Sequence, residues 1–126
     1  YNLFEELRLE NFSIFPGSEL KLLKGLQLGC SGIIAATCNV TAELSRKVYD
    51  DFINGKEQTQ YEKLCEVRKV FDKYDLISGL HTFWAKENII YKNVLPPLSL
   101  LNKDDEQNLI LSLKRLNFHN KSSMAA

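Results

Sequence analysis

Two short apolar runs separated by a helix-length segment constrain the fold of this chain more than any other feature. Residues 12–15 are too few for a helix and rich in aromatic side chains, and residues 32–37 form a continuous, largely apolar run. Both runs predict β-strands. The second does not alternate polar and apolar residues, which is typical of a strand buried on both faces of a parallel sheet. The strand starts lie 20 residues apart. That spacing leaves room for a helix, so we expect a right-handed parallel crossover.

Two buried parallel strands do not make a stable sheet by themselves, because each would be an edge strand with unpaired backbone groups. We therefore expect the chain to be the C-terminal part of a larger α/β domain whose other strands lie upstream of Tyr1. Residues 1–8 point the same way. Leu3, Phe4 and Leu7 share one helical face there and predict a helix that no strand precedes.

Helix signals dominate the rest of the chain. Ser18 is the expected N-cap of a helix that ends before Gly29, with Glu19 in the first turn, where a carboxylate favours the helix dipole. Thr41 is expected to cap the next helix, which the Asn-Gly pair at 54–55 ends. Further helices are expected over residues 57–73, over 78–91 and after an Asn102 cap, before a frayed tail at 119–126.

Apolar residues recur at helical spacing in these segments and predict a buried stripe on each helix. The expected inward residues are Leu20, Leu23, Leu26, Leu44, Val48, Phe52, Tyr61, Leu64, Val67, Phe71, Tyr74, Leu80, Phe83, Trp84, Leu109, Ile110, Leu113 and Leu116. His81 shares a face with Trp84, and packing is favoured over catalysis for both.

Charge and cysteine content exclude several classes of function. Sixteen basic and sixteen acidic residues cancel, so nothing indicates binding to nucleic acid or to an acidic membrane surface. No apolar run approaches the roughly 20 residues that span a bilayer, and four charged residues among the first ten argue against a signal peptide there. Three cysteines without a C-x-x-C pair favour thiols in a reducing cytosol over disulfides, and with two histidines they do not suggest a zinc site.

The turn after the first predicted strand holds candidate ligand-binding residues, because ligands bind at the carboxyl ends of parallel strands. Gly17 would let backbone amides approach a ligand. Ser18 and Glu19 place a hydroxyl and a carboxylate beside a helix N-terminus. The alternative is a helix cap after a Pro-Gly turn, which the local sequence favours.

The second predicted strand ends in small and polar residues. Ala36 leaves space there, and Thr37 and Asn39 carry groups that can hydrogen-bond a substrate. Tight packing followed by an asparagine turn explains the pattern equally well. Cys38 has no cation close in sequence to lower the pKa of its thiol, so we do not expect a nucleophile. No lysine lies at the end of either strand, where a desolvated, imine-forming lysine would be held.

Several short strings, taken in order, resemble one enzyme family. They are FPGSE at 15–19, LGCSGIIAATCN at 28–39, the helix at 43–52 followed by NGK, SGLHT at 78–82 and LPPLSLLNKDDE at 95–106. Their order and spacing resemble the C-terminal half of the pyruvate-dependent class I aldolases. That family includes dihydrodipicolinate synthase, N-acetylneuraminate lyase and 2-keto-3-deoxygluconate aldolase.

The resemblance implies an α/β fold, the C-terminal part of a (β/α)8 TIM barrel with strand 7 at 12–15 and strand 8 at 32–37. Three C-terminal helices would follow. The barrel part would span residues 1–55, a helical appendage residues 56–118 and a tail residues 119–126. Strands 1 to 6 would then lie upstream, which resolves the missing-sheet problem.

The catalytic groups that the family uses would also lie upstream. A lysine on strand 6, a few residues before Tyr1, would form an imine with pyruvate, and the resemblance implies no other cofactor and no metal. A tyrosine on an earlier strand would shuttle the proton. The substrate-binding residues that the resemblance implies in this chain are Gly17, Ser18, Glu19, Ala36, Thr37 and Asn39.

The identity of the substrate is the most specific expectation. Sialate lyases carry two acidic residues in the strand 7 turn, whereas Glu19 is followed here by Leu20. The resemblance therefore favours cleavage of a 2-keto-3-deoxy sugar acid, such as 2-keto-3-deoxygluconate, to pyruvate and an aldehyde. The alternatives are dihydrodipicolinate synthase or N-acetylneuraminate lyase activity and, from another class, a non-catalytic helical interaction module. The implied protein is a cytoplasmic homotetramer whose partner is a small 2-keto acid, not nucleic acid or a membrane.

Overall fold

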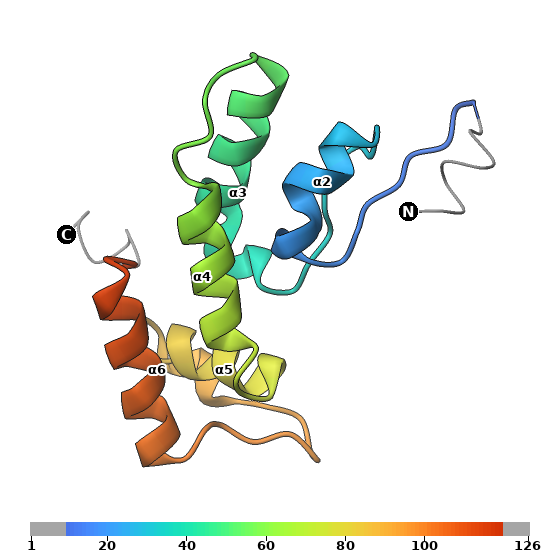
Figure 1. Cartoon of the computed structure of the whole chain (residues 1–126). Coiled ribbons are helices and arrows are strands. Elements are labelled where there is room, and N and C mark those ends of the chain that lie inside the picture. The colour runs from blue at the N-terminus through green and yellow to red at the C-terminus, as the bar shows by residue number, and fades with distance from the viewer. Residues whose placement is uncertain (1–9, 120–126) are drawn as a thin grey trace. The chain divides into compact units, whose positions relative to one another are not determined.

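The computed structural model describes residues 10–119 (Figure 1). The elements are η1 (Glu19–Lys21), α2 (Leu22–Gln27), α3 (Cys38–Ile53), α4 (Tyr61–Phe71), α5 (Leu76–Trp84), η2 (Ile89–Lys92) and α6 (Lys103–Arg115). Residues up to Cys65 form one compact unit and residues from Glu66 form a second, so the division falls within α4. The helix expected over residues 1–8 and nearly all of the expected tail lie outside the described residues.

The structure does not confirm the two predicted strands, because residues 10–119 contain no regular strand. The stretches around the two predicted strands, residues 12–16 and 31–34, nevertheless run side by side, and we call them the extended segments. The Ser31 N–H donates to the Ile14 carbonyl at 2.9 Å, and the Ile34 N–H donates to the Pro16 carbonyl at 3.2 Å. Both segments advance in the same direction, as in a parallel pair. Between these two bonds a parallel ladder needs an N–H from residue 16, and proline has none.

The expectation that both segments are buried on both faces is wrong for the described part of the chain. Phe12, Phe15 and Ile34 expose 58%, 44% and 72% of their surface. Residues 10–119 supply no further strand to cover these side chains. These side chains are therefore exposed because the described residues contain no sheet that would cover them.

The first unit buries an apolar core between α2, α3 and α4. Its fully buried members are Leu22, Leu26, Val48 and Leu64, with Ile33, Leu44, Tyr49, Phe52 and Tyr61 packed against them. The inward face of the first helix therefore runs through Leu22 and Leu26, not through Leu20 as predicted. The chain enters this helix through the 3-10 turn η1, in which Glu19 is buried and Leu20 is exposed.

Several predicted helix ends are confirmed. The Ser18 side chain caps η1 by accepting from the Leu20 N–H at 3.3 Å. Gly29 and Gly55 have positive φ values of 90° and 63° after α2 and α3, a conformation that glycine adopts without steric cost. Both helices therefore end at the glycines that the sequence indicates.

The predicted boundaries of three helices are wrong. α3 begins at Cys38, so Thr41 lies inside the helix instead of capping it. α4 covers 61–71 instead of the expected 57–73. The helix expected over 78–91 is interrupted: α5 starts earlier, because the Asp75 carboxylate caps the Ser78 N–H, and it ends at Trp84. The Asn88 side chain then caps the separate turn η2.

The second unit packs around aromatic rings and leucines. Phe71 is fully buried, and its ring meets Phe83 edge to face, with centroids 5.9 Å apart. Leu109 and Leu113 of α6 are buried as expected. Trp84 packs with Tyr91 at 5.9 Å between ring centroids. His81 Nδ1 lies 2.8 Å from the Tyr91 carbonyl and connects η2 to α5. These contacts support packing as the role of His81 and Trp84.

Asn102 provides a test of the last predicted cap, which the structure confirms. Its side chain accepts from the Asp105 N–H at 2.8 Å. Asn102→Ala should lower the free energy of unfolding by about 1 kcal/mol, because a helix donor loses its partner. Asn102→Asp should restore most of the loss, since aspartate caps as well as asparagine does. Urea unfolding of the three proteins measures both differences; equal stability of all three would contradict the assigned cap.

Candidate functional site

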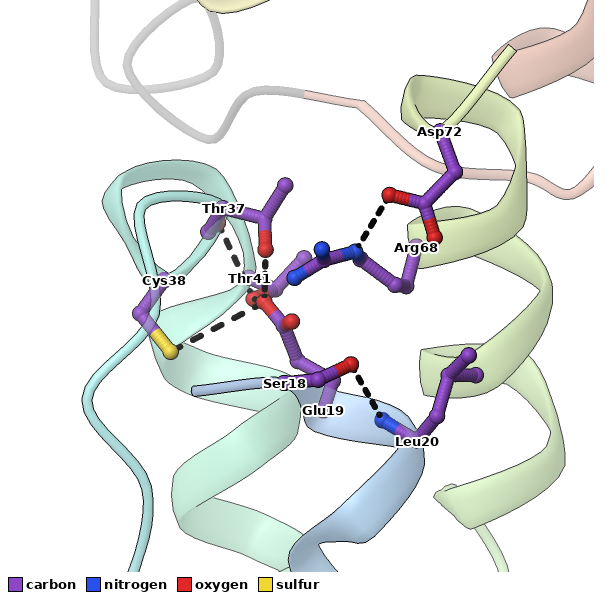
Figure 2. A network of polar contacts seen from close by, with 8 residues as sticks. All are labelled: Ser18, Glu19, Leu20, Thr37, Cys38, Thr41, Arg68 and Asp72. Carbon is purple, nitrogen blue, oxygen red and sulfur yellow. Dashed lines mark hydrogen bonds and ion pairs between the residues drawn. The ribbon is translucent and has the colours of Figure 1, made fainter. Parts of the chain in front are cut away.

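Glu19 is the centre of a buried polar cluster that joins the Pro-Gly turn to the start of α3. Its side chain is 0% exposed. Its Oε1 accepts hydrogen bonds from Thr37 Oγ1, from Thr41 Oγ1 at 2.7 Å and from Cys38 Sγ at 3.7 Å. Figure 2 shows these three donors converging on the carboxylate. We call Glu19, Thr37, Cys38 and Thr41 the Glu19 cluster.

Local backbone geometry explains why these groups meet. Ser18 is extended, with φ −155° and ψ 139°, and η1 begins directly after it, so Glu19 occupies the first helical position. Thr37 and Thr41 lie four residues apart, which places their side chains on the same face of α3. The Thr37 side chain accepts no capping hydrogen bond from α3, and its hydroxyl donates to Glu19.

Thr41 has two acceptors within reach and one hydrogen to donate. Its Oγ1 lies 2.7 Å from Glu19 Oε1 and 3.1 Å from the Thr37 carbonyl. The shorter distance and the charge of a carboxylate both favour Glu19 as the acceptor. Thr41 therefore links α3 to the turn η1 that begins at Glu19, a role that the prediction of Thr41 as a helix cap missed.

The Cys38 thiol acts as a donor in this cluster. Partial burial raises the pKa of Cys38, and the nearby Glu19 charge raises it further, because both disfavour the thiolate. Ser45 Oγ lies 4.0 Å from the sulfur. A raised thiol pKa agrees with the expectation that Cys38 is not a nucleophile.

The remaining candidate residues lie outside the buried cluster. Gly17 is exposed, and a Cβ placed on it would lie 3.8 Å from the Ile34 carbonyl, so the turn approaches the second extended segment. Ser18 and Ala36 are half-buried, and Asn39 is exposed. The Asn39 amide donates to the Ala36 carbonyl at 2.8 Å.

The candidate residues therefore separate into two sets. Glu19 and Thr37 are buried and bonded to each other, whereas the other four retain surface. Sequence reasoning missed Thr41, which belongs to the Glu19 cluster, and Ser45, whose hydroxyl lies beside the Cys38 sulfur. Thr37, Thr41 and Ser45 recur at i, i+4 and i+8 and are all buried, and this spacing of small polar residues was the available signal.

Neither a metal centre nor a disulfide accounts for this cluster. Within residues 10–119, no group of three or more histidine, cysteine, aspartate or glutamate side chains is placed to hold a metal ion. None of the three cysteines forms a disulfide. No helix in the described part of the chain combines the length and the apolar character needed to cross a membrane.

The chain belongs to the dihydrodipicolinate synthetase family, whose family model matches residues 2–116. This match covers both extended segments and all the described helices. The family expected from the short strings is therefore confirmed, whereas the specific likeness to 2-keto-3-deoxygluconate aldolase is not. No curated protein sequence matches the chain significantly.

Solved structures that are similar to this chain include three with related names. Dihydrodipicolinate synthase DapA-2 from Bacillus anthracis has a TM-score of 0.75 at 17% identity and is matched over 84% of this chain and 37% of its own. Proteus mirabilis N-acetylneuraminate lyase has a TM-score of 0.76 at 21% identity, over 92% and 41%. YagE, a prophage protein of the dihydrodipicolinic acid synthase family from E. coli K12, was solved in complex with pyruvate. It has a TM-score of 0.69 at 22% identity, over 86% and 38%.

These likenesses define the fold of the chain. It spans about two fifths of the length of each matched structure. It therefore corresponds to a fragment of a TIM barrel, as expected, although residues 10–119 form no regular strand at the positions assigned to strands 7 and 8.

Proposed function

We propose that this chain is the C-terminal part of a Schiff-base aldolase that acts on a 2-keto acid. The family match over residues 2–116 carries the proposal. The solved complex of YagE with pyruvate supports pyruvate as the shared small molecule. The reacting lysine would lie upstream of Tyr1, so this chain would contribute to the pocket wall and not to the chemical step.

The proposed chemistry needs no metal. The lysine amine attacks the keto carbon of the 2-keto acid substrate, the carbonyl oxygen leaves as water, and the resulting iminium accepts the electron pair of the carbon–carbon bond that breaks. The enamine that remains on the lysine is protonated and hydrolysed, which releases pyruvate. The other product is an aldehyde. In this chain the accessible residues Gly17, Ser18, Ala36 and Asn39 would face the tail of the substrate, with Glu19 and Thr37 directly behind them.

We propose a 2-keto-3-deoxy sugar acid as the substrate. Leu20 follows Glu19, and its side chain is 38% exposed, whereas the Glu19 carboxylate is turned inward onto its cluster. The turn therefore presents no acidic side chain that would favour a sialate tail. Dihydrodipicolinate synthase and N-acetylneuraminate lyase activities are the alternatives, because proteins with those names share the fold.

Borohydride trapping tests the proposed chemistry in the full-length protein that contains this chain. Reduction in the presence of pyruvate should convert the imine into a stable adduct on one lysine, which peptide mass spectrometry should locate upstream of Tyr1. Reduction without pyruvate is the control and should leave that lysine unmodified. Absence of the adduct would overturn the aldolase proposal and favour the non-catalytic helical interaction module.

A substrate panel separates the three activities. The proposal expects pyruvate release from 2-keto-3-deoxygluconate with the highest kcat/KM. N-acetylneuraminate cleavage, and condensation of pyruvate with aspartate semialdehyde, should be slower. A higher kcat/KM for either alternative substrate would overturn the proposed substrate and leave the Schiff-base mechanism unchanged.

Assembly and location extend the proposal. We propose a cytoplasmic homotetramer that binds neither nucleic acid nor membrane, with the barrel part ending near residue 55. Balanced charge supports the absence of these two partners. Sedimentation equilibrium of the full-length protein tests the tetramer, and a monomer would contradict it.

A further inference from the structure

A buried carboxylate needs a reason, because removing a charge from water is costly unless donors surround it. Glu19 has no exposed surface, and one of its oxygens accepts from residues 37, 38 and 41. All three donors belong to the first turn of α3 or its cap position. The N-terminus of this 16-residue helix also attracts negative charge.

The cluster supplies a link where the backbone lacks one. Two backbone hydrogen bonds join the extended segments at Ile14 and Pro16. The intervening bond of a parallel ladder is missing because Pro16 has no N–H. The Glu19 side chain reaches from the turn after Pro16 to the residues that follow the second segment. It therefore joins the two segments at the end where the candidate pocket residues lie.

The accessible residues depend on this link through short connections. Ala36 immediately precedes Thr37, whose hydroxyl donates to Glu19. Asn39 is held by its own bond to the Ala36 carbonyl at 2.8 Å. A shift of Thr37 relative to Glu19 would therefore move both Ala36 and Asn39 relative to Gly17.

We propose that Glu19 is a positioning residue: its buried carboxylate sets the placement of Ala36 and Asn39 relative to Gly17, without contacting substrate. This inference deepens the proposed function and rests on it for the kinetic consequences. It assigns the same role to Thr41, which is 0% exposed and for that reason does not touch a ligand. If Glu19 instead contacted the substrate directly, replacing Glu19 would weaken substrate binding, whereas replacing the buried Thr41 would not.

The test compares Glu19→Gln, Thr41→Val and the double variant in the full-length protein. Amide hydrogen exchange across residues 31–40 is the first measurement, because it needs no activity. Both single variants should exchange faster there than the parent protein. Glu43→Gln, which removes the same charge from an exposed position on α3, is the matched control and should leave the exchange unchanged. Unchanged exchange in both cluster variants would overturn the positioning role.

Kinetics distinguish positioning from direct contact. Both single variants should raise the KM for the 2-keto-3-deoxy sugar acid by about tenfold. The KM of the double variant should be no higher than that of the poorer single variant, because the effects of residues in one network are not additive. Pyruvate trapping by borohydride should persist in all of them. A raised KM in Glu19→Gln with an unchanged KM in Thr41→Val would show direct contact by Glu19 and overturn the inference.

The two levels of the proposal fail separately. Loss of borohydride trapping in the parent protein would remove the aldolase function, yet the exchange measurement would still decide whether Glu19 positions residues 36–39. If Glu19→Gln does not fold, Thr41→Val alone carries both measurements. It removes one hydroxyl from the cluster and leaves the carboxylate in place.

Discussion

Replacing Leu109 with alanine should lower the free energy of unfolding of the second unit by about 3–5 kcal/mol, because deletion of a buried side chain loses its transfer free energy and leaves a cavity. Leu109 lies in the middle of α6 and has no exposed surface. Urea unfolding followed by the fluorescence of Trp84, the one tryptophan of this chain, measures the change.

Leu111→Ala is the matched control for this prediction. Leu111 lies two residues further along the same helix and is 49% exposed. The same substitution should cost less than about 1 kcal/mol there, since much of the side chain already contacts water. Similar losses in the two variants would mean that α6 does not bury the face that contains Leu109.

Replacing Lys47 with methionine should destabilise the first unit by about 1–3 kcal/mol, because it leaves a buried carboxylate without its donor. Lys47 Nζ lies 2.6 Å from Asp51 Oδ1, and the Asp51 side chain is 3% exposed. Asp51 Oδ2 has no hydrogen-bond partner among the described residues. The substitution therefore removes the side-chain donor that the structure records for this carboxylate.

A neighbouring ion pair with the same spacing is the control. Arg46 and Asp50 are also four residues apart, at 2.9 Å, but their side chains are 71% and 43% exposed. Arg46→Met should change the stability far less, because water solvates Asp50 when the arginine is gone. Thermal or urea unfolding of the two variants compares them directly. A larger loss for Arg46→Met would contradict the importance of burial at Asp51.

Local chemistry explains most of the elements that sequence reasoning placed well. The Ser18 and Asn102 caps and the glycine stops at 29 and 55 depend on a few neighbouring atoms, so residue type alone indicates them. The misplaced helix starts also come from local sequence, because more than one nearby residue can begin a helix. Asp75 caps α5, but the serine and glycine that follow it also suit a helix start, so local patterns did not distinguish the two positions.

At the candidate site, residue type predicted some of the residues that take part but not how their side chains are arranged. Gly17 to Glu19 and Ala36 to Asn39 were selected as two separate strand ends, and the structure brings Glu19 and Thr37 into one hydrogen-bonded cluster. The direction in which each side chain points was not predicted. Residue type indicates that Glu19 can bind a ligand, but a buried carboxylate bonded to three donors has a different role from an exposed one.

The sequence by itself determined the family, the succession of helices and the need for more strands than residues 10–119 supply. Those properties follow from periodicity, capping residues and the order of short strings, all of which are local. Only the tertiary structure decided that Glu19 turns inward, that Thr41 lies within α3 and that Phe12, Phe15 and Ile34 stay exposed. The reason is physical. Burial and hydrogen-bond partners depend on residues that lie far apart along the chain, and for Glu19 those donors come 18 to 22 residues later.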